Sequence, residues 1–345
     1  MYRYTGQKRY RQQALDLVEQ VHGILGRHRD DDPRSGWISG LDDESGRLHP
    51  TLGGLRIGKR LSERKRSQPF EAQLEWDRDG QYYHYLTKWM HALHQVTAVT
   101  GEPIYHQWAC ELGKTMHRAF AHQLGSGAEK RLYWKMSIDM TYPLVPSMGH
   151  HDPLDGLITC SEVQKPSAGP PAAMPSCDLT HEIADLSDIC KNKAWTTDDP
   201  LGIGGLLFDA VRMLQIMASD TGFKDHVLLC DVLHSSMVGL QAFSAGGSLR
   251  ARTEERLAFR ELGLAIGLHA VPRMLALLQG GIEFEQHDTV KNQLKTLMAA
   301  LPLATSIETF WLHLGNRQSA SWRAHENINM VMLATSLAPD GFLNL

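Results

Sequence analysis

Near the middle of the chain, residues 146–156 read PSMGHHDPLDG and bring two histidines and two aspartates together. Imidazole titrates close to neutral pH, and a carboxyl group can be tuned toward it, so this segment could transfer protons. His151, Asp152 and Asp155 could also hold a metal ion, but no other segment offers a clear partner ligand. We therefore predict no metal site and no cofactor. Asp152 precedes Pro153, as Asp199 precedes Pro200, and both aspartates could simply cap a helix.

Other segments that lead into apolar helices carry similar side chains, among them 71–89 (EAQLEWDRDGQYYHYLTKW), 131–156, 248–256 and 319–327. Aromatic rings beside carboxylates and arginines suit a sugar, which stacks on rings and hydrogen-bonds through hydroxyls. The candidate catalytic residues are Asp77, Asp79, Asp139, His151 and Asp152. The candidate substrate-binding residues are Tyr83, His84, Trp134, Lys135, His150, Arg250, Arg252, Trp322 and His325. The two arginines could bind a substrate carboxylate, although a solvated run of charges has the same pattern.

These residues are compatible with three functions. Glycoside hydrolysis needs one protonated and one ionised carboxyl group around the scissile bond. The pair would take one member from Asp77 or Asp79 and the other from Asp139 or Asp152. A sugar isomerase or epimerase would use histidines instead, and the candidates are His84, His151, His269 and His325. A non-catalytic carbohydrate-binding protein is the third possibility. The EWDRDGQ segment is no EF-hand, because its twelfth position is Leu86 instead of glutamate.

The helical period of apolar residues predicts an all-α protein. The expected helices cover 9–25, 84–99, 103–120, a segment after Pro153, 178–193, 201–218, 224–243, 253–278, 289–301, 305–314 and 325–337. Residues 33–60 are rich in glycine and predict a small irregular or β-hairpin insertion. Residues 164–178 hold four prolines and predict a loop.

Composition and charge limit the partners. A net charge of -4 predicts no nucleic-acid partner. The N-terminus lacks the apolar core of a signal peptide, and no uninterrupted apolar run reaches about 18 residues, so we expect no membrane partner. Five widely spaced cysteines without a C-x-x-C argue against a disulfide framework or a structural zinc site, and predict a cytoplasmic protein. The oligomeric state stays open.

Apolar helices such as LGIGGLLF and LGLAIGLHA alternate with helices that have a polar face. With this alternation, the TG-x-P-x-Y turn at 100–105 and an aromatic-rich first inner helix, the chain resembles the six-hairpin glycosidase superfamily. Unsaturated glucuronyl hydrolases and N-acylglucosamine 2-epimerases share that scaffold, and no single family's catalytic motif is matched. The resemblance implies one (α/α)6 toroid over residues 1–345. It also implies a site where the inner helices begin, and a small-molecule or oligosaccharide substrate.

Overall fold

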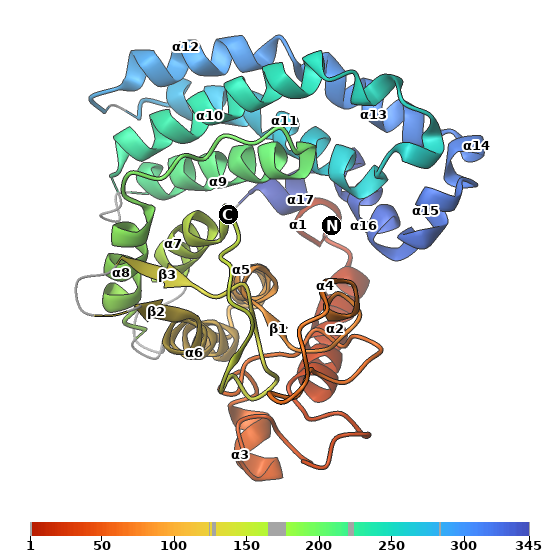
Figure 1. Cartoon of the computed structure of the whole chain (residues 1–345). Helices are drawn as coiled ribbons and strands as arrows, with labels where there is room; N and C mark the ends of the chain where they lie inside the picture. The colour runs from red at the N-terminus through yellow and green to blue at the C-terminus, as the bar shows by residue number, and fades with distance from the viewer. Residues whose placement is uncertain are drawn as a thin grey trace. The chain divides into compact units, whose positions relative to one another are not determined.

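The computed structural model describes residues 2–123, 125, 129–164, 177–219, 224–282 and 284–344, and it is mostly helical (Figure 1). Contacts along the chain divide it into two compact units, residues 1–192 (unit 1) and 193–345 (unit 2). Each unit is described by itself. The predicted all-α class is confirmed, whereas the toroid and the single domain stay predictions.

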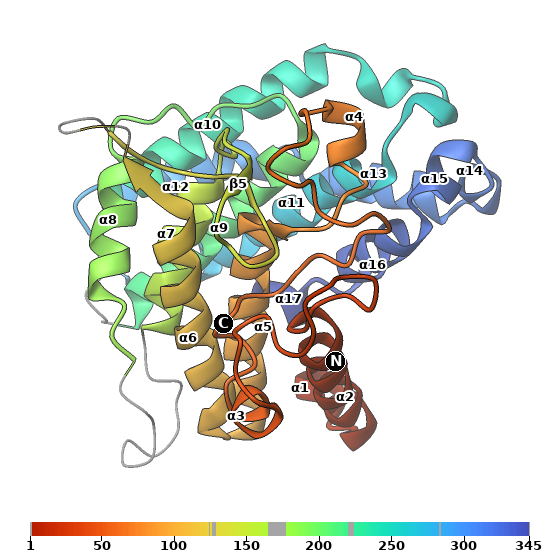
Figure 2. The same ribbon diagram turned by 60° about the horizontal axis from the view of Figure 1, so that its bottom comes forward.

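Unit 1 contains a helical hairpin packed against further helices. Its helices are α1 (Tyr2–Thr5), α2 (Lys8–Leu25), α3 (Asp43–Leu48), α4 (Ala72–Glu75), α5 (Tyr83–Thr100), α6 (Pro103–Phe120), α7 (Asp152–Val163) and α8 (Thr180–Cys190). Gly101 ends α5 with a φ of 74°, a conformation that glycine adopts without strain, and Pro103 starts α6. Figure 2 shows α5, α6 and α7 next to one another, and they contact each other directly. The helical hairpin therefore positions the start of α7.

Two small antiparallel sheets complete unit 1. One sheet has the order β1 (Gln81–Tyr82), β4 (Lys135–Met136), β5 (Pro143–Val145), and the other pairs β2 (Ala121–Gln123) with β3 (Lys130–Leu132). Tyr82 pairs with Lys135, so the segment before α5 lies beside the segment before α7. Strands of two or three residues carry no recognisable period, which is why the sequence analysis missed them.

Residues 33–60 form an irregular insertion, which is one of the two predicted alternatives, and not a β-hairpin. All of them are described, and they contain helix α3 and an isolated bridge between Arg27 and Trp37, but no strand. The buried side chain of Gln81 fastens the insertion to the sheet. Its amide donates to the carbonyl oxygens of Gly53 (2.9 Å) and Ile138 (2.6 Å), and its oxygen accepts from the backbone N–H of Leu55 (2.7 Å).

Unit 2 is a helical array built around α9 and α11. Its helices are α9 (Pro200–Ala218), α10 (His226–Ala245), α11 (Ala258–Gln279), α12 (His287–Met298), α13 (Leu301–Leu312), α14 (Leu314–Arg317), α15 (Ala320–Ala324), α16 (Glu326–Leu337) and α17 (Asp340–Leu343). Short 3-10 turns cover Ser248–Arg250 and Thr253–Glu255. A Cβ atom on Gly204 would lie 2.1 Å from the carbonyl oxygen of Gly263, so glycine lets α9 and α11 approach backbone to backbone.

Three segments of unit 2 are long and apolar enough to cross a membrane by length and composition: Pro200–Ala218, His226–Arg250 and Ala258–Gln279. The first includes the buried ion pair of Arg212 with Asp209, whose charged atoms are 3.2 Å apart. Because these charges interrupt the apolar sequence, the segment contains no uninterrupted apolar run of about 18 residues. The absence of a membrane partner therefore stays a prediction.

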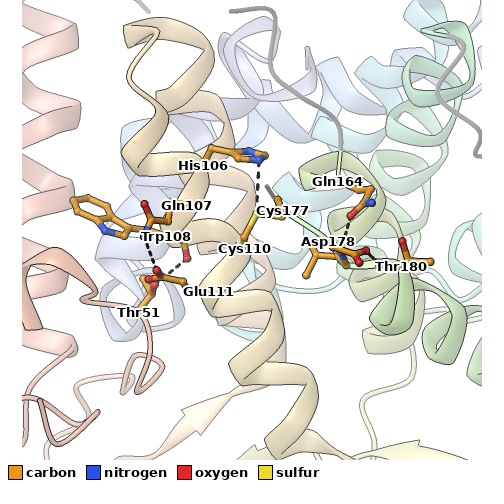
Figure 3. The surroundings of a disulfide bond; sticks show 11 residues. Thr51, His106, Gln107, Trp108, Cys110, Glu111, Gln164, Cys177, Asp178 and Thr180 are labelled. Atoms are coloured by element: carbon orange, nitrogen blue, oxygen red, sulfur yellow. Dashed lines mark hydrogen bonds between the residues drawn. A yellow bond between two sulfur atoms is a disulfide. The ribbon is translucent and has the colours of Figure 1, made fainter. Parts of the chain in front are cut away.

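The cysteine prediction is wrong for one pair, because Cys110 and Cys177 form a disulfide (Figure 3). Cys110 lies on α6 and Cys177 just before α8, and their Cα atoms are 5.8 Å apart. Packing of α6 near α8 brings together residues 67 positions apart, a contact that spacing in the sequence does not reveal. Disulfides persist mainly in oxidising compartments. The cytoplasmic location stays a prediction.

Candidate acid/base site

Asp152, the first residue of α7, is a buried carboxyl group with an unusual environment. It is only 8% exposed, and its Oδ2 atom has no hydrogen-bond partner among the described residues. Burial and the nearby charge of Asp155 raise the pKa of Asp152 to about 7, against the weaker opposing effects of Lys88 and a backbone hydrogen bond from Gly149. Asp152 is therefore populated in both protonation states near neutral pH.

Asp155 lies one helical turn further along α7, and both of its carboxylate oxygens accept hydrogen bonds from side chains. Its Oδ1 accepts a hydrogen bond from the Lys88 ammonium group at 2.7 Å, and its Oδ2 accepts one from the Thr87 hydroxyl. Thr87 and Lys88 both come from α5, which contacts α7. Residues three apart on a helix face the same side, so Asp152 and Asp155 are neighbours. The site thus combines a carboxyl group that is partly protonated near pH 7 with an ion-paired carboxylate.

Tyr83 adds a proton donor to the same place. It is fully buried at the start of α5, and its hydroxyl has no hydrogen-bond partner in the described part of the chain. A Cβ atom on Gly156 would lie 2.2 Å from this hydroxyl, so a glycine in α7 makes room for it. Burial and, secondarily, the neighbouring Cys160, Asp152 and Asp155 raise the pKa of Tyr83 well above its usual value. The phenol therefore stays protonated and can donate a hydrogen bond.

A cluster of aromatic rings lies beside these groups. Trp134 has its ring centroid 5.0 Å from that of Trp76, 4.9 Å from that of Tyr82 and 6.3 Å from that of His84, on which it stacks. The His84 ring in turn lies 4.6 Å from that of Tyr85. Trp76 and Tyr85 are 57% and 48% exposed, so the cluster presents rings to the solvent. We call these five side chains the aromatic cluster.

His84 links the aromatic cluster to the carboxylates. It precedes Lys88 by four residues on α5, and these two positions share a face of the helix. Burial lowers the pKa of His84 to about 4, an effect that Asp155 opposes and Lys88 reinforces. The imidazole is therefore neutral at pH 7 and can accept and donate hydrogen bonds without carrying charge.

The helix-cap interpretation of the two Asp-Pro pairs is wrong. The N-cap position of α7 is His151, and Asp152 already lies inside the helix. Asp199 is at the N-cap of α9 but accepts no capping hydrogen bond; its Oδ2 instead accepts from Arg260 at 2.7 Å. His150 is exposed and His151 half-buried, with their ring centroids 4.6 Å apart. Both histidines thus border Asp152, as the sequence suggested.

Asp79 and Asp139 were expected to be catalytic, but their contacts are structural. Asp79 is completely buried, and its carboxylate accepts hydrogen bonds from Arg29 and Arg56 and from the N–H groups of Gly58 and Gly80. Burial would raise the pKa of Asp139, but hydrogen bonds from Ser137 and Thr141 and the charge of Arg34 outweigh it and lower that pKa. The arginines and hydrogen bonds around both carboxylates give them a structural role. Asp77 has an exposed side chain outside these networks.

Lys135 was expected to bind substrate, but its ammonium group is fully used inside the protein. It donates to the Glu75 carboxylate (2.9 Å) and to the carbonyl oxygens of Glu75 (2.7 Å) and Arg78 (2.8 Å). An ammonium group has three donors, so none is left for a ligand. We therefore exclude Lys135 from the proposed site.

The remaining candidates lie in unit 2, and the site described here consists of unit 1 residues. Arg250 and Arg252 are exposed, and Arg252 forms a surface ion pair with Glu255. Trp322 is buried against Trp311, with ring centroids 5.6 Å apart. Exposed His325 contacts the Phe259 ring edge-on at 5.3 Å, and His269 pairs with Glu308 at 2.7 Å. Because Trp322 is buried, its ring has no exposed face on which a sugar could stack.

Several residues of the site had no clear signal in the sequence. Asp155 appeared only as a possible metal ligand, while Thr87, Lys88 and the exposed rings of Trp76 and Tyr85 were not chosen. One pattern in the sequence could have indicated Lys88: it lies four residues after His84, on the same helix face, directly after a segment rich in aromatic residues. No family model, curated protein or solved structure matches this chain.

Proposed function

We propose that unit 1 contains the acid/base centre of a carbohydrate-active enzyme, and that this enzyme is a glycoside hydrolase. The observation that carries the proposal is the contrast between Asp152, with a pKa raised to about 7, and Asp155, paired with Lys88. Hydrolysis of a glycosidic bond requires one carboxyl group that can give a proton and a second one that is ionised. The resemblance to six-hairpin glycosidases supports the same reaction class.

In this proposal Asp152 is the general acid. The glycosidic oxygen needs a proton as its bond to the sugar breaks, and a carboxyl group with a pKa near the working pH can give that proton and take it back. Asp155 is the ionised partner, which stabilises positive charge on the sugar ring or activates the attacking water. Lys88 holds the Asp155 carboxylate in place.

The aromatic cluster is the proposed sugar-binding surface. Sugar rings pack their C–H faces on aromatic side chains, and exposed Trp76 and Tyr85 offer such faces. Neutral His84 can hydrogen-bond a sugar hydroxyl in either direction. The substrate class is therefore a small saccharide or the end of an oligosaccharide.

The test compares wild type with Asp152→Asn on a panel of aryl glycosides and oligosaccharides. General acid catalysis contributes about 10²- to 10⁴-fold, so turnover of oligosaccharides should fall at least about 100-fold. Aryl glycosides with good leaving groups need little protonation and should lose much less. Wild-type activity should decrease as pH rises through about 7, and the variant should lack this decrease. Asp30→Asn, at an exposed aspartate of unit 1 outside the proposed site, is the matched control and should behave as wild type.

Epimerisation of a sugar is the second candidate function, because half-buried His151 directly precedes Asp152 and would supply a second proton-transfer group. Incorporation of solvent deuterium into a recovered sugar, without release of new reducing ends, would support it over hydrolysis. Saccharide binding that is tight, without turnover and unaffected by Asp152→Asn would contradict both enzymatic proposals and favour a binding protein.

A further inference from the structure

A second group of side chains that could bind a metal lies between the C-terminal end of α6 and helix α8. His117 is in the last turn of α6, and His181 and Asp185 are on α8. His181 and Asp185 are four residues apart, which places both side chains on one face of the helix. One nitrogen of each imidazole and one oxygen of the carboxylate all lie within 4.8 Å of one another.

The geometry of this group approaches that of a metal site. Asp185 Oδ2 lies 3.0 Å from His117 Nε2 and 3.9 Å from His181 Nε2. Ligand bonds of about 2.0–2.2 Å in a tetrahedron place ligand atoms roughly 3.3–3.5 Å apart, so only small movements would bring the three atoms to one ion. His117 is buried and fixed, while His181 is 75% exposed and free to adjust.

The surroundings of Asp185 fit the outer sphere of such a site. The Lys130 ammonium group binds Oδ1 of Asp185 at 2.5 Å, which leaves Oδ2 facing the two imidazoles. Carboxylates that ligate a metal are commonly held in this way by a second group through their other oxygen. The three side chains also line a cavity of about 290 Å³, together with His122 and Lys130. This volume can hold an ion and its remaining water ligands.

We propose that His117, His181 and Asp185 form a Zn²⁺ site with an open coordination position. Two imidazole nitrogens and one carboxylate oxygen are a ligand set that zinc favours. Three protein ligands beside an open cavity are typical of zinc sites that bind water or an exogenous ligand, whereas purely structural sites use four protein ligands. The sequence analysis predicted no metal site because His117 comes from a segment 64 residues before His181.

The test is a titration of tag-free, metal-stripped protein with Zn²⁺ and with Co²⁺, followed by calorimetry and by absorption. The protein is kept without reductant, so that the Cys110–Cys177 disulfide cannot supply thiolates. We expect one ion per chain, and a Co²⁺ spectrum with d–d bands but no thiolate charge-transfer band. Thiolate bands would place the metal on cysteines and overturn the proposal.

Variants decide whether these three residues are the ligands. His181→Ala and Asp185→Asn should each weaken Zn²⁺ binding by more than about 100-fold, because even loss of an outer-sphere partner costs about 10- to 100-fold. His181→Ala alters an exposed side chain, so its fold should be retained, and circular dichroism checks this. His234→Ala, an exposed histidine on α10, is the matched control and should bind as wild type. Zn²⁺ affinity unchanged in Asp185→Asn, or no binding by wild type, would overturn the proposal.

Discussion

Replacing Asp152 by asparagine should change how the stability of the protein depends on pH. The pKa of Asp152 is raised from 3.8 to about 7 by burial and by the charge of Asp155. The folded state therefore holds this proton more tightly than the unfolded state does. The resulting stabilisation is complete below pH 3.8 and is lost as the pH rises through about 7. Asparagine resembles the protonated carboxyl group at every pH, so the variant should not show this loss.

The size of the effect follows from the shift. One pKa unit corresponds to about 1.4 kcal/mol, so a shift of roughly three units corresponds to about 4 kcal/mol. Because Asp152 is 8% exposed, solvent screening reduces this figure little. Relative to wild type, Asp152→Asn should gain up to about 4 kcal/mol of unfolding free energy between acidic and mildly alkaline pH.

Urea denaturation at a series of pH values from 4 to 8, followed by circular dichroism, measures this difference without any substrate. Asp77→Asn, at an exposed position, controls for the loss of one negative charge. A difference between wild type and Asp152→Asn that stays constant over this pH range would refute the raised pKa. The assignment of Asp152 as a general acid near neutral pH would then fail as well.

Two further predictions concern stability. Reduction of the Cys110–Cys177 disulfide, or Cys110→Ser, should lower the unfolding free energy by about 4 kcal/mol, because a cross-link spanning 67 positions restricts the unfolded chain; an unchanged urea midpoint after reduction would contradict this. Gly204→Ala should lower the unfolding free energy by about 1–3 kcal/mol, because its Cβ atom would lie 2.1 Å from the Gly263 carbonyl oxygen. Gly205→Ala has open space around the new Cβ atom and should not lower the unfolding free energy. Equal thermal midpoints for these two variants would refute backbone contact between α9 and α11.

The helices were predictable because local signals determine them. The apolar period and Pro103 predicted a helix over 103–120, and α6 has these bounds. The helix expected over 84–99 is α5 (Tyr83–Thr100), and Gly101 ends it in a left-handed conformation. Pairings between distant segments have no such signal. The contact of Tyr82 with Lys135 in the sheet and the Cys110–Cys177 disulfide depend on how helices pack.

The site was predictable only in part, for a related reason. The sequence pointed to the segments before α5 and α7, and both contribute residues. The local sequence does not indicate which aspartate forms ion pairs with arginines from distant segments. Asp79 meets Arg29 and Arg56, which lie 50 and 23 positions away, and these ion pairs are invisible in the local pattern. Asp155 meets Lys88 from 67 positions away.

The comparison of two buried aspartates gives the strongest reason to assign function to one of them. Asp79 is completely buried, yet two guanidinium groups and two backbone N–H groups satisfy its carboxylate. Asp152 is nearly as buried, but its Oδ2 and the Tyr83 hydroxyl have no partner among the described residues. Each such unsatisfied group costs about 1–3 kcal/mol. A residue kept only for stability would resemble Asp79, so the unsatisfied carboxyl group of Asp152 supports the proposal that this residue acts as a general acid.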